Sequence, residues 1–266
     1  MQKIIKYLFY LGISTCILAL ILIISTNLYL KPNLPKISLV DQSELQMPLK
    51  VYTKDGILIG EFGEIKRRAI TFEEIPQDIK NAFLAAEDDN FFNHQGISYT
   101  GLIRSFLRCL RPAGCEGGGG TISMQVVRGY LLTREQTIIR KIKEIFLALE
   151  LESNLNKEEI FELYVNRIFL GNRSYGIQAA ANTYFDKDLN ELNIAESATI
   201  AALAQLPSRV NPVKDPRRTL QRRNWILSRM LLLDHITFED YQESVSENIN
   251  IANNINLYDV DAGYIA

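Results

Sequence analysis

An uncharged run near the N-terminus constrains this chain more than any other feature of its sequence. No charged residue occurs over residues 7–30. As a helix, this run would measure about 36 Å, which is enough to cross a hydrocarbon layer of about 30 Å. Lys3 and Lys6 precede it, and positive residues stay on the cytoplasmic side. We therefore expect a cytoplasmic tail at 1–6, a single-pass anchor at 7–30 in the inner (cytoplasmic) membrane, and a periplasmic or extracytoplasmic body.

A cleaved signal peptide is the alternative reading of this run. The apolar core of a signal peptide usually has about 7–15 residues and ends in small residues at the cleavage site. Here the run is longer and leads into Lys-Pro-Asn-Leu-Pro at 31–35. An uncleaved anchor is therefore favoured. No second uncharged run of this length follows, which argues against a polytopic transporter or pore.

Composition narrows the class of the remaining chain. Of its 266 residues, 47% are hydrophobic and 23% are charged, which excludes a disordered, collagenous or disulfide-scaffold protein. The formal net charge of −2 is not the balance of a nucleic-acid-binding protein, so we expect no nucleic-acid partner.

The body is predicted to be mainly helical, with a small β element near the membrane. Asp55-Gly56 separates two β-prone runs within 51–71, which is a hairpin signal. Apolar residues recur at helical spacing over 75–88. Three pairs predict further helix starts: Asn156 with Glu159, Asn193 with Glu196, and Thr237 with Asp240. The helix that starts at Asn156 is expected to end near Gly171, and the helix that starts at Asn193 is expected to end at Leu206.

Two features of the segment after residue 100 keep alternatives open. The sequence 101–111 has one apolar stripe and one arginine stripe, which suits a helix in a bilayer surface and equally a helix packed on the core. Cys109 and Cys115 flank a short loop and could form a disulfide outside the cytoplasm. Two unpaired thiols are the alternative, because sequence does not report the Cα separation.

The absence of several catalytic motifs argues against some classes of enzyme. The chain lacks Ser-x-x-Lys, Lys-Thr-Gly, Gly-x-x-x-x-Gly-Lys-[Ser/Thr], His-Glu-x-x-His and Gly-x-Ser-x-Gly, which argues against acyl-serine transpeptidases, nucleotide triphosphatases and zinc proteases. What remains is Glu87-Asp88, at the end of an apolar helix and followed by aromatic residues. Apolar surroundings raise the pKa of a carboxyl group toward the range useful for proton transfer, so Glu87 is a candidate base or acid. A solvated helix end is the alternative, and His94 alone reads as a structural histidine.

Four ordered motifs carry a family resemblance. They are Glu-Asp-x-x-Phe-x-x-His-x-Gly at 87–96, Gly-x-Thr-Ile-x-x-Gln at 119–125, Arg-Lys-x-x-Glu at 140–144 and Lys-x-x-Ile-x-Glu-x-Tyr-x-Asn at 157–166. A fifth, Arg222-Arg223-x-x-Ile-Leu, fits a more degenerate motif. In this order they resemble the peptidoglycan glycosyltransferases, which occur alone as monofunctional murein transglycosylases or as the N-terminal module of class A penicillin-binding proteins.

The resemblance implies a lysozyme-like, mainly α glycosyltransferase domain that polymerises lipid II into glycan strands. Glu87 would be the general base and Glu144 a second essential carboxylate that organises the donor site and a divalent cation, Mg²⁺ or Mn²⁺. The domain would span 71–235, between a linker and hairpin at 31–70 and a C-terminal helix and tail at 236–266. Residues matching substrate-binding positions are Asp88, Phe91, His94, Thr121, Gln125, Arg128, Arg140, Lys141, Lys143 and Asn166.

Departures from the family pattern keep two alternatives open. Gly120 replaces a Ser, Met124 a Gln, and Arg128 a Lys that faces the pyrophosphate in the family; an Arg keeps the charge but not the geometry. A catalytically weak membrane scaffold that binds cell-wall synthesis partners is one alternative, and a lytic, glycan-cleaving enzyme is the other. The tail at 258–266 resembles the linker to a transpeptidase domain, so a truncated or split class A protein, with a transpeptidase as partner, is a further hypothesis.

Overall fold

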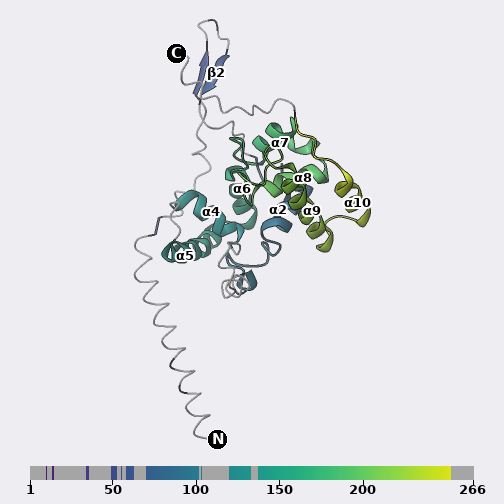
Figure 1. Cartoon of the computed structure of the whole chain (residues 1–266). Coiled ribbons are helices and arrows are strands. Elements are labelled where there is room, and N and C mark those ends of the chain that lie inside the picture. The colour runs from purple at the N-terminus through teal and green to yellow at the C-terminus, as the bar shows by residue number, and fades with distance from the viewer. Residues whose placement is uncertain are drawn as a thin grey trace.

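The computed structural model describes 70–101, 103, 120–132 and 137–252, two strands in 49–62, and residues 10, 14, 34, 35 and 55 (Figure 1). The predicted anchor, apart from two of its residues, and the segment with Cys109 and Cys115 lie outside this set. Within the described part of the chain, no helix has the length and apolar character needed to cross a membrane.

The described chain is mainly helical, as predicted. Strands β1 (Leu49–Tyr52) and β2 (Leu58–Phe62) pair antiparallel, with Leu49 opposite Phe62. The helices are α2 (Gln77–Glu87), α4 (Ile122–Leu131), α5 (Ile138–Asn154), α6 (Lys157–Arg167), α7 (Ile177–Phe185), the 3-10 helix η4 (Leu189–Glu191), α8 (Ile194–Leu203), α9 (Pro216–Leu232) and α10 (Phe238–Ser246).

Helix starts follow the capping signals of the sequence. Capping boxes are formed at the starts of α6, α8 and α10 by the predicted pairs. The predicted ends were too late for two helices: α6 stops at Arg167 and α8 at Leu203. Ile168 leaves helical geometry with ψ 132°, and the chain after Leu203 tightens into turns before Pro207, which disfavours helical geometry in the residue before it.

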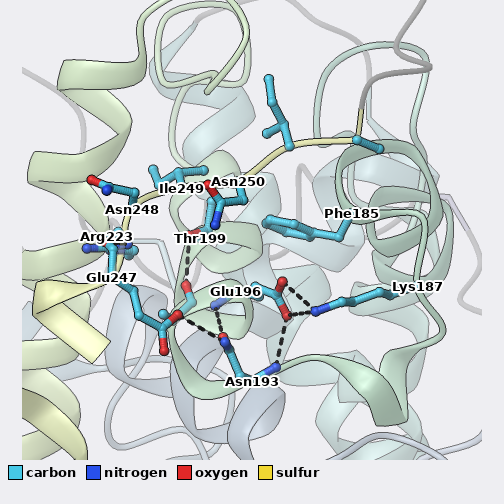
Figure 2. Close-up of a pocket in the computed structure, with 13 residues that line it drawn as sticks. Phe185, Lys187, Asn193, Glu196, Thr199, Arg223, Glu247, Asn248, Ile249 and Asn250 are labelled. Carbon is cyan, nitrogen blue, oxygen red and sulfur yellow. Dashed lines mark hydrogen bonds and ion pairs between the residues drawn. The ribbon is translucent and has the colours of Figure 1, made fainter. Parts of the chain in front are cut away.

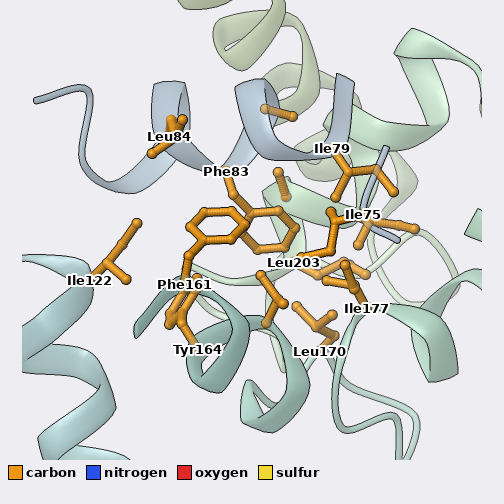
Figure 3. Close-up of a cluster of buried hydrophobic side chains, with 14 of the residues drawn as sticks. Ile75, Ile79, Phe83, Leu84, Ile122, Phe161, Tyr164, Leu170, Ile177 and Leu203 are labelled. Carbon is orange, nitrogen blue, oxygen red and sulfur yellow. The ribbon is translucent and has the colours of Figure 1, made fainter. Parts of the chain in front are cut away.

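A buried aromatic cluster fixes the position of α2. Phe83 is fully buried and meets Tyr164 of α6 edge-on, with ring centroids 5.9 Å apart (Figure 3). Burying a side chain of this size contributes about 1.5–3 kcal/mol. Helix α2 also packs against α8 and α9, while α4 packs against α5 and α6. Helix α2 thereby lies between the α4–α5 pair and the α8–α9 pair (Figure 1), and Glu87 is its last residue.

Candidate active site

Glu87 ends α2 and points its carboxylate toward α4. The side-chain amide of Gln125 donates to Glu87 Oε2 at 2.8 Å. Burial raises the pKa of Glu87, and the hydrogen bond from Gln125 and the charges of Arg222 and Arg128 oppose that rise without cancelling it. A carboxylate with a raised pKa and a fixed amide donor is suited to accept a proton.

Arg222 is a site residue that the sequence analysis did not assign. It comes from α9, and its Nη2 donates to the carbonyl of Ala86 at 3.3 Å, next to Glu87. Burial lowers the pKa of Arg222, and the charge of Glu87 raises it. The guanidinium also lies 4.1 Å from the ring centroid of Trp225. Its motif was visible in the sequence, but periodicity does not reveal a contact between residues this far apart.

Asp88, His94 and Thr121 tie the loop after α2 to the start of α4. Asp88 Oδ2 accepts hydrogen bonds from His94 Nε2 at 2.9 Å and from the backbone N–H of Ile122 at 3.1 Å. Thr121 caps α4 and donates its hydroxyl to the carbonyl of Gly96 at 2.6 Å. In this structure these three side chains make their contacts within the protein.

Phe91 lies in the core below this loop. It is fully buried, and Lys157 Nζ lies 4.4 Å from its ring centroid. Lys157 also binds Glu152 at 2.6 Å, and Glu152 accepts a hydrogen bond from Ser123 of α4. The aromatic residue therefore supports the loop and α4 from beneath.

Glu144 is buried on α5 between two cationic side chains. Its Oε2 lies 3.0 Å from Lys141 Nζ, and its Oε1 lies 3.3 Å from Arg140 Nε. Lys143 is partly buried on the same helix. A Cβ added at Gly120 would come 3.7 Å from Lys141 Nζ, so this charged group lies at the entrance to α4.

Arg128 of α4 is linked to Glu87 through Gln125. It lies on the exposed face of α4, and its Nη2 is 3.5 Å from Gln125 Oε1. Gln125 thus contacts Arg128 through its oxygen and Glu87 through its nitrogen. The α4 face therefore connects the carboxylate to a solvent-facing cation.

Asn166 of α6 contacts the backbone of the segment before α2 through its side chain. Its amide accepts from the N–H of Ile70 at 3.0 Å and donates to the carbonyl of Ile70 at 2.8 Å. It also donates to the carbonyl of Glu162 at 3.0 Å. These contacts fix the backbone at Ile70, before α2, to helix α6. The side chain of Asn166 therefore bonds to the protein backbone in this structure.

Tyr164 is a second neighbour of Glu87 that the sequence analysis left unassigned. Burial and the charge of Glu87 raise the pKa of its phenol well above the usual value. Its hydroxyl is buried, and it has no hydrogen-bond partner among the described residues. On folding, this hydroxyl therefore loses its hydrogen bonds to water and gains none from the described residues.

Tyr164→Phe tests this position. The ring would keep its packing on Phe83, and an unpaired buried hydroxyl would be removed. We expect the free energy of unfolding to rise by about 1 kcal/mol, measured by chemical denaturation. A decrease in stability would show that the hydroxyl makes a contact worth more than its desolvation.

The described residues do not fit a metal site at Glu144. Both of its oxygens face cationic groups, which compete with a divalent ion for the same carboxylate. No group of three or more His, Cys, Asp or Glu side chains suited to a metal occurs in the described part of the chain. The divalent cation implied by the family resemblance stays a prediction.

A cavity of about 400 Å³ lies away from Glu87, between α8, α9 and the segment 247–252 (Figure 2). Lys187 and Glu196 form an ion pair at 2.7 Å on its wall, and Arg223 closes one side. Its lining includes none of the predicted site residues. Apart from Asn166 of α6, the predicted residues that the structure describes instead lie around the end of α2 and along α4 and α5.

The sequence of this chain matches a family model. The model described as Transglycosylase matches residues 55–231. The chain therefore belongs to this family, and it corresponds to the glycosyltransferase module of class A penicillin-binding proteins.

Several relatives that it resembles are longer proteins. Penicillin-binding protein 1A of Pseudomonas aeruginosa is 46% identical over 265 residues, which is 100% of this chain and 32% of that protein. The same-named proteins of Haemophilus influenzae and Escherichia coli are 48% and 39% identical, over 78% and 94% of this chain and 24% and 29% of theirs. A crystal structure of the Haemophilus influenzae protein aligns with a TM-score of 0.46 at 33% identity, over 79% of this chain and 22% of that one. The chain spans about a quarter to a third of these relatives' length.

Proposed function

We propose that this chain is a peptidoglycan glycosyltransferase that polymerises lipid II in cell-wall biogenesis. The observation that carries the proposal is Glu87, held at the end of α2 with a raised pKa and a hydrogen bond from Gln125. Family membership makes lipid II the expected substrate. Lipid II is a disaccharide-pentapeptide on a polyprenyl pyrophosphate, and the growing glycan strand is the second reactant.

In the proposed reaction, Glu87 removes the proton from the GlcNAc 4-hydroxyl of the acceptor. The freed oxygen attacks the anomeric carbon of the donor strand's MurNAc, and the bond from that carbon to the pyrophosphate breaks. Direct displacement inverts the configuration from α to β and releases polyprenyl pyrophosphate. A positioned general base of this kind contributes about 100- to 10,000-fold to a rate.

The cations on α4 and α5 suit the leaving group. Arg128, Arg140, Lys141 and Lys143 lie on the side of Glu87 formed by these two helices. Fixed positive charge stabilises the negative charge that grows on a departing pyrophosphate. Arg128 presents a planar fork that can bind a phosphate through two hydrogen bonds. Glu144 would position Arg140 and Lys141 for this role, since it pairs with both.

The membrane setting follows from the substrate. A polyprenyl chain stays in the bilayer, so the site must work at its surface, and the uncharged run at 7–30 would hold it there. A single-pass anchor with the N-terminus in the cytoplasm and the site in the periplasm fits this arrangement. A transpeptidase acting on the same strands would be the natural partner.

The two alternatives from the sequence differ in what they release. A lytic enzyme would liberate soluble sugars from purified sacculi, and a scaffold would fold cooperatively but form no polymer. The cations of α4 and α5 favour the transferase, because hydrolysis of a glycan strand has no pyrophosphate to stabilise.

The pH dependence tests the role of Glu87. Only the ionised carboxylate can accept a proton, so the rate should fall as the pH drops through the raised pKa of Glu87. The hydrogen bond from Gln125 lowers that pKa, so Gln125→Leu should move the acidic limb of the profile to higher pH. The measurement is kcat/KM for lipid II against pH for both proteins. An acidic limb that moves to lower pH in Gln125→Leu would contradict the assignment.

A further inference from the structure

A second cavity shares one residue, Arg222, with the candidate active site. It has a volume of about 420 Å³ and is lined by residues that include Leu206, Arg209, Arg218, Gln221, Arg222 and Trp225. Arg222 belongs to both places, because it lines this cavity and also donates to Ala86 beside Glu87. The cavity therefore shares Arg222 with the site, and its other lining residues come from α9 and from the chain that follows α8.

The lining combines positive charge with exposed apolar surface. Three of its residues are arginines and none is acidic. Asp215 Oδ2 lies 3.7 Å from Arg218 Nε in an exposed pair, which is a weak interaction. Trp225 is 43% exposed and Leu206 is 47% exposed. Arginine forks bind carboxylates through paired hydrogen bonds, so this surface suits an extended ligand that carries carboxylates.

The pentapeptide is the part of the proposed substrate that can reach this cavity. The inference rests on the proposed function, in which the pyrophosphate lies toward α4 and α5. The cavity lies instead between the chain after α8 and the first half of α9. The pentapeptide branches from the MurNAc sugar at the reaction centre and extends up to about 17 Å.

We propose that this cavity, the Trp225 pocket, binds the carboxylate-bearing stem peptide of lipid II. Arg209 and Arg218 would bind its carboxylates, while Trp225 and Leu206 would cover its apolar side chains. Arg222, held beside Glu87, would link peptide binding to the reacting sugar. The pocket thereby selects peptide-bearing substrate, a role separate from the chemistry at Glu87.

Tryptophan fluorescence reports directly on this pocket, because Trp225 is the single tryptophan of the 266-residue chain. The experiment titrates the full chain in detergent with soluble MurNAc-pentapeptide and, separately, with MurNAc alone. We expect a saturable change in emission with the pentapeptide form only. In Arg209→Gln/Arg218→Gln the apparent Kd should rise about tenfold, whereas the control Lys214→Gln/Arg217→Gln loses the same charge at exposed positions outside the lining and should bind as wild type.

A kinetic arm uses lipid II and an analogue without the peptide. The Arg209→Gln/Arg218→Gln variant should raise KM for lipid II about tenfold and leave kcat/KM for the peptide-free analogue within about twofold of wild type. An equal loss on both substrates, or an equal fluorescence response to MurNAc alone, would overturn the proposal in favour of a sugar site. No response to either titrant would also overturn it. Because the titration needs no turnover, it separates this proposal from failure of the proposed function, which would appear as absent polymer.

Discussion

Glu87→Gln is expected to lower the rate of lipid II polymerisation by about 100- to 10,000-fold. The substitution keeps the shape of the side chain and its contact with Gln125, but it removes the group that accepts the proton. The measurement is the initial rate of polymer formation from labelled lipid II by the purified protein in detergent. Glu150→Gln, at an exposed position of α5, is the matched control and should retain the wild-type rate.

The same variant should remain folded, which separates catalysis from stability. The pKa of Glu87 is raised in the folded state, so the folded protein binds this proton more tightly than the unfolded chain does. Ionisation of Glu87 therefore destabilises the fold as the pH rises from the unfolded pKa through the raised one. Glu87→Gln removes that cost, and its Tm at neutral pH should equal or exceed that of the wild type. A variant that polymerises at the wild-type rate would remove Glu87 from the mechanism.

Arg223→Ala is expected to produce the largest loss of stability. Arg223 is 1% exposed, and it donates to the carbonyls of Glu247 at 2.8 Å and Val245 at 3.2 Å, at the end of α10. Its Nε donates to Asn224 Oδ1 at 3.0 Å. Truncation would leave these two carbonyls without their charged donor and open a gap beside the cavity of Figure 2.

We expect this change to lower the free energy of unfolding by about 3 kcal/mol, because hydrogen bonds to a charged group contribute about 1.5–3 kcal/mol each. For a domain of this size, that corresponds to a drop in Tm of about 6–12 °C by calorimetry. Arg217→Ala removes an exposed arginine from the same helix and should change Tm little. A loss no greater than that of Arg217→Ala would show that the end of α10 does not depend on Arg223.

Local signals in the sequence predicted the helical framework well. Capping side chains act within one turn, so the starts of α6, α8 and α10 could be read from Asn156, Asn193 and Thr237. Helix ends were less predictable, because α8 stops before Pro207 through turns that the residue pattern does not encode. Local sequence signals do not predict how helices that are distant in the sequence pack against each other.

The candidate site shows the same division. Glu87 could be singled out because its carboxylate ends an apolar helix, and desolvation follows from that position. Packing of α2 against α9 brings Arg222 beside it, and packing against α6 brings Tyr164, and neither contact has a periodic signature. The motif position of Asn166 predicts substrate binding, which stays a prediction, and its side-chain amide bonds to the backbone of Ile70, a contact that the sequence did not indicate.

The most direct test of the central claim is the product that the wild-type chain forms from labelled lipid II in detergent. We predict glycan polymers on a gel, with one polyprenyl pyrophosphate released for each bond formed, and no polymer from Glu87→Gln under the same conditions. Unchanged lipid II in both samples, from proteins that unfold cooperatively, would contradict the assignment of this chain as a glycosyltransferase.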